Sequence, residues 1–153
     1  PDLGSTKRAR NFAEELNPPL AIIEKRRLGN DDRTEVLNLI GSVDDAQVIL
    51  IDDEIDTAGS ITQAAELCIA RGAREVYAAC THAVLSGPAV ERLALSPIKE
   101  LVVPDTIPLP PHKRLDKITV LSVAPLLGES IQRIHTGASV SLAYRSAGRL
   151  PLR

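Results

Sequence analysis

The sequence predicts an α/β fold with a parallel-rich sheet flanked by helices. Short apolar runs rich in β-branched residues alternate along the chain with segments whose apolar residues recur at helical spacing. The apolar runs are unbroken rather than alternating, which is typical of strands in parallel sheets covered on both faces. Neither the glycine fingerprint of dinucleotide-binding proteins nor a Walker A string is present, so the pattern does not indicate a Rossmann oxidoreductase or a P-loop kinase.

Length and composition limit the possible functions. The 153 residues suffice for one domain with a proper core. A net charge of −2 gives no general attraction to nucleic acid or to anionic membranes, and no apolar run approaches the roughly 20 residues that span a bilayer. The two cysteines lack metal-ligand spacing, and the three histidines are scattered. We therefore expect a cytoplasmic protein without nucleic-acid or membrane partners, and a fragment of a longer chain, because it begins with Pro1.

The N-terminal part is predicted to hold a helix, a short strand and a basic loop. A turn at residues 2–6 is expected to lead into a helix that begins near Arg8 and that two prolines at 18 and 19 end. Residues 20–23 read as a short buried strand. Four charged residues follow at 24–27, and the polar, glycine-containing stretch 28–33 is typical of a surface loop. From composition alone, the simpler interpretation of this stretch is a solvated run of charges.

The centre of the chain combines a strand, a pair of acids, a turn and a helix. Residues 48–51 form an unbroken apolar strand that ends on Asp52 and Asp53, and the turn 56–60 leads into a helix from 61 to about 71. This order presents backbone N–H groups and a positive helix end to a phosphate, whereas carboxylates suit sugar hydroxyls. The alternative is a structural turn in which Asp and Ser cap the helix without any ligand.

The rest of the chain continues the alternation of strands and helices. Strands are predicted at 35–40, 75–81, 100–103 and 118–123, and helices at 89–95 and from Pro125 to near 135. Ser86 and Pro88 are predicted to start the first of these helices as a cap and an early proline. His82 lies just past a strand end, where open α/β sheets place ligands, although a plain surface turn explains it equally well. The segment 104–114 holds four prolines and should be extended.

The segment 52–60, with the sequence DDEIDTAGS, resembles the phosphoribosyl diphosphate (PRPP) binding loop of type I phosphoribosyltransferases and PRPP synthetases. Glu54 departs from the pattern, because the synthetases usually have an apolar residue there. The segments THAVLSGPAVERL, ELVVPDTIPLP and KITVLSVAPLL also match the synthetases. The resemblance is to the C-terminal half of ribose-phosphate diphosphokinases. It implies a phosphoribosyltransferase-like domain at 1–142, a C-terminal tail at 143–153, and an N-terminal half that this chain lacks.

The resemblance also implies roles for particular residues. Lys25 and Arg27 match the catalytic Lys and Arg that stabilise the charge developing during diphosphoryl transfer, and Asp2 matches a ligand of the magnesium site. The acids after the central strand would hold ribose hydroxyls, and the turn would hold the 5-phosphate. The residues implied to bind ribose 5-phosphate are Asp52, Asp53, Asp56, Thr57, Ala58, Gly59 and Ser60.

The implied reaction transfers the diphosphoryl group of ATP to the 1-hydroxyl of ribose 5-phosphate, giving PRPP and AMP with Mg2+. In the family, ATP sits largely between the N-terminal half and a neighbouring subunit of a homo-oligomer, a hexamer. We therefore expect little activity from the isolated chain. Three alternatives stay open: a type I phosphoribosyltransferase, a catalytically silent regulatory subunit associated with PRPP synthetase, and a non-enzymatic α/β domain.

Overall fold

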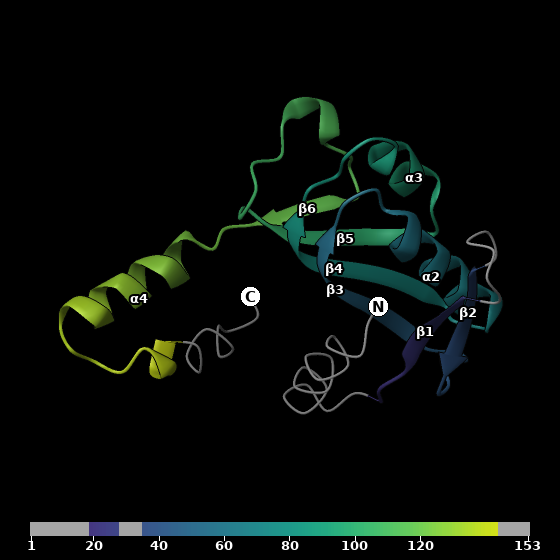
Figure 1. Ribbon diagram of the computed structural model, residues 1–153, viewed down its shortest axis with the longest axis horizontal. Helices are drawn as coiled ribbons and strands as arrows, with labels where there is room; N and C mark the ends of the chain where they lie inside the picture. The colour runs from purple at the N-terminus through teal and green to yellow at the C-terminus, as the bar shows by residue number, and fades with distance from the viewer. Residues whose placement is uncertain (1–18, 28–34, 144–153) are drawn as a thin grey trace. The chain divides into compact units, whose positions relative to one another are not determined.

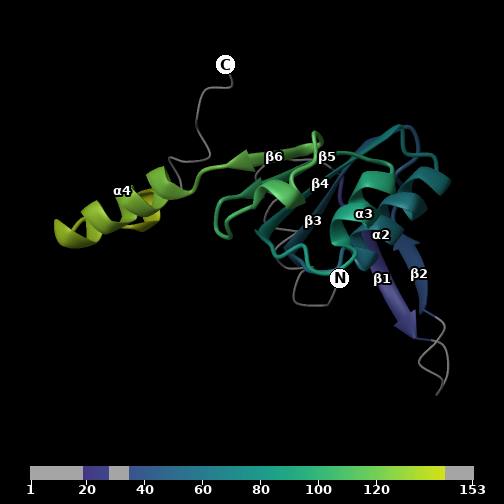
Figure 2. The same cartoon turned by 90° about the horizontal axis from the view of Figure 1, so that it is seen from above.

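The structure is a computed structural model that describes residues 19–27 and 35–143 (Figures 1 and 2). The chain divides into two compact units, Pro1–Val120 and Leu121–Arg153. The helix predicted within 1–18, the loop predicted at 28–33 and most of the tail lie outside the described residues. Among the described residues, no helix is both long enough and apolar enough to cross a membrane.

The first unit is built on a four-stranded sheet, and the predicted α/β class is confirmed. The strands lie in chain order and are β3 (Gln47–Ile55), β4 (Glu75–Ala83), β5 (Ile98–Pro104) and β6 (Ile118–Leu121). The β3–β4 and β4–β5 pairs are both parallel. Val48 lies opposite Val76 and Leu50 opposite Ala78, so the apolar runs of neighbouring strands are in register.

Two helices pack against one face of this sheet. They are α2 (Gly59–Ala70) and α3 (Ala89–Leu95), and α3 has the bounds that the sequence predicts. Alternate residues of a strand point to opposite faces, and those of β4 and β5 that point toward the helices are fully buried in one core cluster. The sequence predicted burial on both faces, but Ile49, in the middle of β3, is 60% exposed. The structure thus describes helices, α2 and α3, on one face of the sheet.

A separate hairpin precedes the sheet. It joins β1 (Ile22–Arg27) to β2 (Glu35–Ile40) in antiparallel fashion, with Ile22 opposite Ile40 and Arg27 opposite Glu35. The prediction of a short buried strand at 20–23 followed by a charged loop is therefore wrong in its boundary. A two-stranded ladder needs only backbone pairing and not burial on both faces, so the strand continues through the charged residues.

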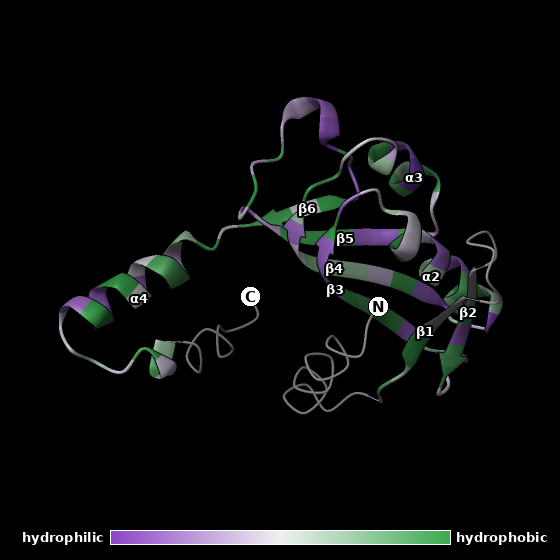
Figure 3. Cartoon of the chain, in the orientation of Figure 1, coloured by the Kyte–Doolittle hydropathy of each residue, from purple (hydrophilic) through white to green (hydrophobic). Residues whose placement is uncertain are grey.

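The remaining elements differ little from the predictions. The proline-rich segment holds only the short 3-10 helix η1 (Pro111–Lys113), and β6 ends two residues early. In the second unit, α4 (Ala124–His135) alternates apolar and polar bands (Figure 3), and none of its residues is buried.

Cys68 and Cys80 are free and buried, and burial raises the pKa of the Cys80 thiol to about 11, so it stays protonated and unreactive.

A polar network at the start of β4 should make the free energy of unfolding depend on pH. The Glu75 carboxylate accepts hydrogen bonds from Lys99, from Tyr77 at 2.9 Å and from Gln47 at 2.7 Å. These bonds, led by that of Lys99, lower the pKa of Glu75 from 4.5 to about 2. A lowered acid pKa gives stability that is complete above pH 4.5 and is lost as pH falls toward 2.

Replacing Glu75 by glutamine should therefore flatten the dependence of unfolding free energy on pH in this acidic window. Urea unfolding followed by circular dichroism from neutral pH to pH 2 measures the dependence. Glu91→Gln, which changes an exposed glutamate of α3, is the matched control. If both variants followed the wild-type curve, the network would contribute nothing to stability.

Candidate functional site

The acidic residues that follow the apolar run belong to the last part of β3. The sequence predicted a strand ending at residue 51, but the strand continues through Asp52, Asp53 and Glu54 to Ile55. The backbone N–H of Asp53 donates to Oδ1 of Asp52 at 2.9 Å, and that of Glu54 donates to Oδ1 of Asp53 at 3.2 Å. The carboxylates thus stand at the carboxyl end of the sheet, where open α/β folds bind their ligands.

Burial raises the pKa of Asp52, and a hydrogen bond with the Asp53 side chain adds to the rise. A carboxylate whose charged form is disfavoured gains from a hydroxyl or cationic partner that replaces lost solvent. The neighbouring carboxyl groups of Asp52 and Asp53 suit a pair of neighbouring sugar hydroxyls, each of which can donate a hydrogen bond.

The turn after β3 leads directly into α2 through a residue in a left-handed conformation. Ala58, the residue before α2, has φ 60° and ψ 7°, and it is only 4% exposed. Non-glycine residues adopt this conformation uncommonly. The side chain of Thr62 stabilises the first helical turn by donating to the carbonyl oxygens of Ala58 and Gly59 at 2.8 and 3.1 Å.

Within the described part of the chain, no side chain caps the start of α2. Ala58 has no hydroxyl or carboxylate to accept the first helical N–H groups, and no side-chain cap is present. The capping role that the alternative gives to Asp or Ser is therefore wrong, while ligand binding by the turn stays a prediction. The amides of the first turn have no acceptor inside the helix, so the helix start can bind an anion.

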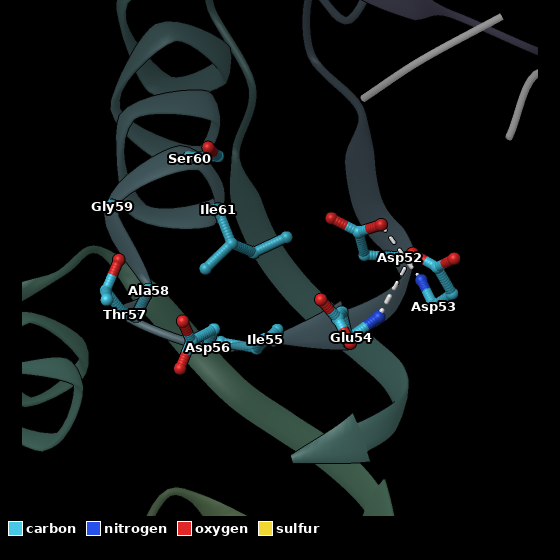
Figure 4. A pocket seen from close by; sticks show the side chains of 10 residues that line it. All are labelled: Asp52, Asp53, Glu54, Ile55, Asp56, Thr57, Ala58, Gly59, Ser60 and Ile61. Carbon is cyan, nitrogen blue, oxygen red and sulfur yellow. Dashed lines mark hydrogen bonds between the residues drawn. The ribbon is translucent and has the colours of Figure 1, made fainter. Parts of the chain in front are cut away.

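These features surround one pocket of about 270 Å3. Figure 4 shows the carboxyl groups of Asp52 and Asp53 on the strand side and the hydroxyls of Thr57 and Ser60 on the helix side. The ten lining residues, 52–61, include no lysine or arginine, so backbone amides and hydroxyls are the donors that the lining offers. All seven residues predicted to bind ribose 5-phosphate belong to this lining, together with Glu54, Ile55 and Ile61.

The other predicted site residues are not brought to this pocket by the described structure. Lys25 and Arg27 lie in β1, with their backbones opposite Leu37 and Glu35, and their side chains lie outside what the structure describes. Asp2 also lies outside the described residues. Among the residues that are described, no three His, Cys, Asp or Glu side chains gather as a metal site. The catalytic and magnesium roles stay predictions.

His82 lies at the carboxyl end of β4 and pairs in register with Glu54. Its Nδ1 is 3.1 Å from Oγ1 of Thr106, whose hydroxyl donates to the carbonyl oxygen of Thr81 at 2.5 Å. His82 is not part of the pocket lining. These contacts tie the strand end to the segment after β5.

The sequence interpretation missed two residues that contact the turn from outside the pocket. Ser86 was expected to cap α3, but its hydroxyl donates to the Asp56 carboxylate, and the residue before α3 is Pro88. Arg92 donates from Nη1 to the carbonyl oxygen of Thr57 at 3.0 Å. Both contacts join residues at least 30 positions apart, and local sequence patterns carry no signal for them.

Comparisons with known proteins agree on one family, the phosphoribosyl synthetases. The family model described as the phosphoribosyl synthetase-associated domain matches residues 30–145. The ribose-phosphate pyrophosphokinase of Caldanaerobacter subterraneus is 61% identical over 144 residues, and that of Corynebacterium ammoniagenes is 53% identical over the same length. Each match covers 94% of this chain and 45% of the relative, so the chain spans a little under half the length of these relatives.

A solved structure agrees with these sequence matches. The crystal structure of phosphoribosylpyrophosphate synthetase from Mycobacterium smegmatis is similar to this chain with a TM-score of 0.80 and 38% sequence identity. The similarity covers 88% of this chain and 43% of the solved chain.

Proposed function

Because this chain belongs to the phosphoribosyl synthetase-associated domain family, we propose that it supplies the ribose 5-phosphate site of a ribose-phosphate diphosphokinase. The whole enzyme would transfer the diphosphoryl group of ATP to the 1-hydroxyl of ribose 5-phosphate and release PRPP and AMP. The observation that carries this proposal is the pocket at 52–61, where paired carboxylates lie beside a turn and an uncapped helix start.

The two sides of the pocket suit the two ends of ribose 5-phosphate. Asp52 and Asp53 would accept hydrogen bonds from ribose hydroxyls, since ionised carboxylates can only accept. The backbone amides around Ala58 and Gly59, with the hydroxyls of Thr57 and Ser60, would donate to the 5-phosphate. The carboxylates would repel a phosphate on their own side, so charge fixes the direction in which the ligand binds.

The transferred group needs cations that the pocket lining lacks. Charge spreads over the oxygens of a phosphoryl group during transfer, and cations held against these oxygens lower the barrier. In the proposal, Lys25 and Arg27 supply this charge from the end of β1. Mg2+, with Asp2 among its ligands, would supply further charge when bound. ATP, the remaining half of the enzyme and the assembly of subunits complete the site, and the isolated chain would have little synthetase activity.

Single changes on each side of the pocket should weaken ribose 5-phosphate binding. Asp53→Asn removes a charged acceptor, and Thr57→Val removes a donor while it keeps the shape of the side chain. Each should cost roughly 1–3 kcal/mol of binding free energy, the usual penalty for leaving a polar partner unpaired. Isothermal titration calorimetry of the 153-residue chain with ribose 5-phosphate measures these losses.

Asp116→Asn is the matched control, because Asp116 is an exposed aspartate outside the pocket lining. Its affinity should equal that of the wild type. Titrations with PRPP and with a free nucleobase separate the alternatives, since a phosphoribosyltransferase should bind the base as well. A wild-type chain that gave no binding heat with ribose 5-phosphate or PRPP would exclude the proposed site.

A further inference from the structure

Three consecutive carbonyl groups, at the end of β3 and in the turn after it, all receive hydrogen bonds from one short segment. This segment comprises residues 85–92, which run from just after β4 into the first half of α3, and we call it the brace segment. The pairs are the N–H of Leu85 to the oxygen of Ile55 at 3.0 Å, the N–H of Ser86 to that of Asp56 at 2.9 Å, and Nη1 of Arg92 to that of Thr57 at 3.0 Å.

These bonds fix the direction of the backbone N–H groups in the turn. The C=O and N–H of a planar trans peptide point in opposite directions. Holding three successive carbonyls toward the brace segment therefore turns the N–H groups of Asp56, Thr57 and Ala58 away from it. Successive N–H groups beside a left-handed residue form a concavity that binds anions, and Ala58 is such a residue.

Arg92 is the one side chain among these three donors, so a substitution can remove its bond without changing the backbone. It is not part of the pocket lining, which means that it would act through the Thr57–Ala58 peptide and not by touching a ligand there. Ser86 adds a second contact, because its hydroxyl donates to the Asp56 carboxylate. The turn is thus held from outside at Asp56 and at Thr57.

We propose that Arg92 is a positioning residue for phosphate binding: its hydrogen bond to the Thr57 carbonyl orients the turn 56–60 so that the turn amides meet the 5-phosphate. This inference rests on the proposed function, which supplies the ligand. It assigns a role to a residue of α3 that neither the motif at 52–60 nor the pocket lining includes.

Arg92→Gln tests the inference in the 153-residue chain, with ribose 5-phosphate as the probe in isothermal titration calorimetry. Losing the bond should weaken binding roughly five- to tenfold. Arg92→Lys keeps one donor and should recover part of the affinity. Arg71→Gln, at the opposite end of α2, makes the same change of net charge and should bind within about twofold of the wild type.

Ionic strength separates positioning from a general effect of charge. Salt screens the attraction between an exposed cation and a phosphate, so a charge effect would fade at about 0.5 M salt. A loss caused by a misoriented peptide should persist there, and the thermal unfolding midpoint should stay near that of the wild type. Binding by Arg92→Gln as tight as wild type, or a loss that disappears at high salt, would overturn the inference and leave the proposed function intact.

Gly59 gives a second and independent variant. A Cβ at Gly59 would lie 3.3 Å from Nη1 of Arg92, so Gly59→Ala should push the guanidinium aside by a few tenths of an ångström. The same change should therefore cost less in the Arg92→Gln background than in the wild type. Strictly additive losses would show that Arg92 does not act at this position. A wild-type chain that does not bind ribose 5-phosphate would overturn this inference and the proposed function together.

Discussion

Replacing Ala58 by valine is expected to lower the free energy of unfolding by roughly 2–6 kcal/mol and to weaken ribose 5-phosphate binding by more than about tenfold. Ala58 has φ 60° and is 4% exposed. A β-branched side chain is strained in this conformation, at a cost of about 1–3 kcal/mol. Two further methyl groups in a closed space add about 1–3 kcal/mol of overpacking. Binding should fall because relief of this strain moves the turn amides away from the phosphate.

Ala58→Gly is the matched control for this prediction. Glycine adopts positive φ without a steric penalty, so its unfolding free energy should differ from wild type by about 1 kcal/mol or less. Urea unfolding and calorimetric titration with ribose 5-phosphate measure the two effects separately. A valine variant that unfolds and binds like the wild type would mean that the turn does not adopt the left-handed conformation in solution.

Replacing Leu93 by alanine should be the most destabilising change in α3. The Leu93 side chain is fully buried between α3 and the sheet, with 0% exposure. Removing a buried leucine side chain to alanine loses roughly 2–5 kcal/mol through lost burial and the cavity left behind. Urea unfolding followed by far-ultraviolet circular dichroism suits this chain, because it has no tryptophan and only two tyrosines.

Leu95 supplies the control within the same helix. It is 82% exposed, so Leu95→Ala should change the unfolding free energy by no more than about 0.5 kcal/mol. The contrast between two leucines two positions apart tests which face of α3 packs on the sheet. Equal losses at both positions would contradict the arrangement of α3 in this structure.

Local sequence was sufficient to predict most of the elements. The apolar run at 48–51, the glycine after the helix and the serine–glycine–proline before α3 are signals that the chain carries within a few residues. They placed α3 at its observed bounds and put β3, the turn and α2 in the right order. The predicted boundaries were wrong where a strand runs into charged residues, as in β1 and at the end of β3.

Those boundaries failed for a shared reason. A strand ends where its ladder of backbone hydrogen bonds ends, and that depends on the partner strand. Arg27 lies in a strand because it pairs with Glu35 of β2. Asp52 lies in a strand because it pairs with Cys80 of β4. The strand ends were predicted from side-chain polarity, which carries no information on this pairing.

The sequence by itself determined the class of fold and the residues that line the candidate pocket, because those residues are contiguous and their chemistry is local. Only the tertiary structure decided how the turn is held. Leu85, Ser86 and Arg92 reach the turn across about 30 residues of chain, because the β4–α3 connection folds back along the end of β3. Hydrogen bonds between segments far apart in the chain depend on the path of the backbone, which no spacing of residue types records.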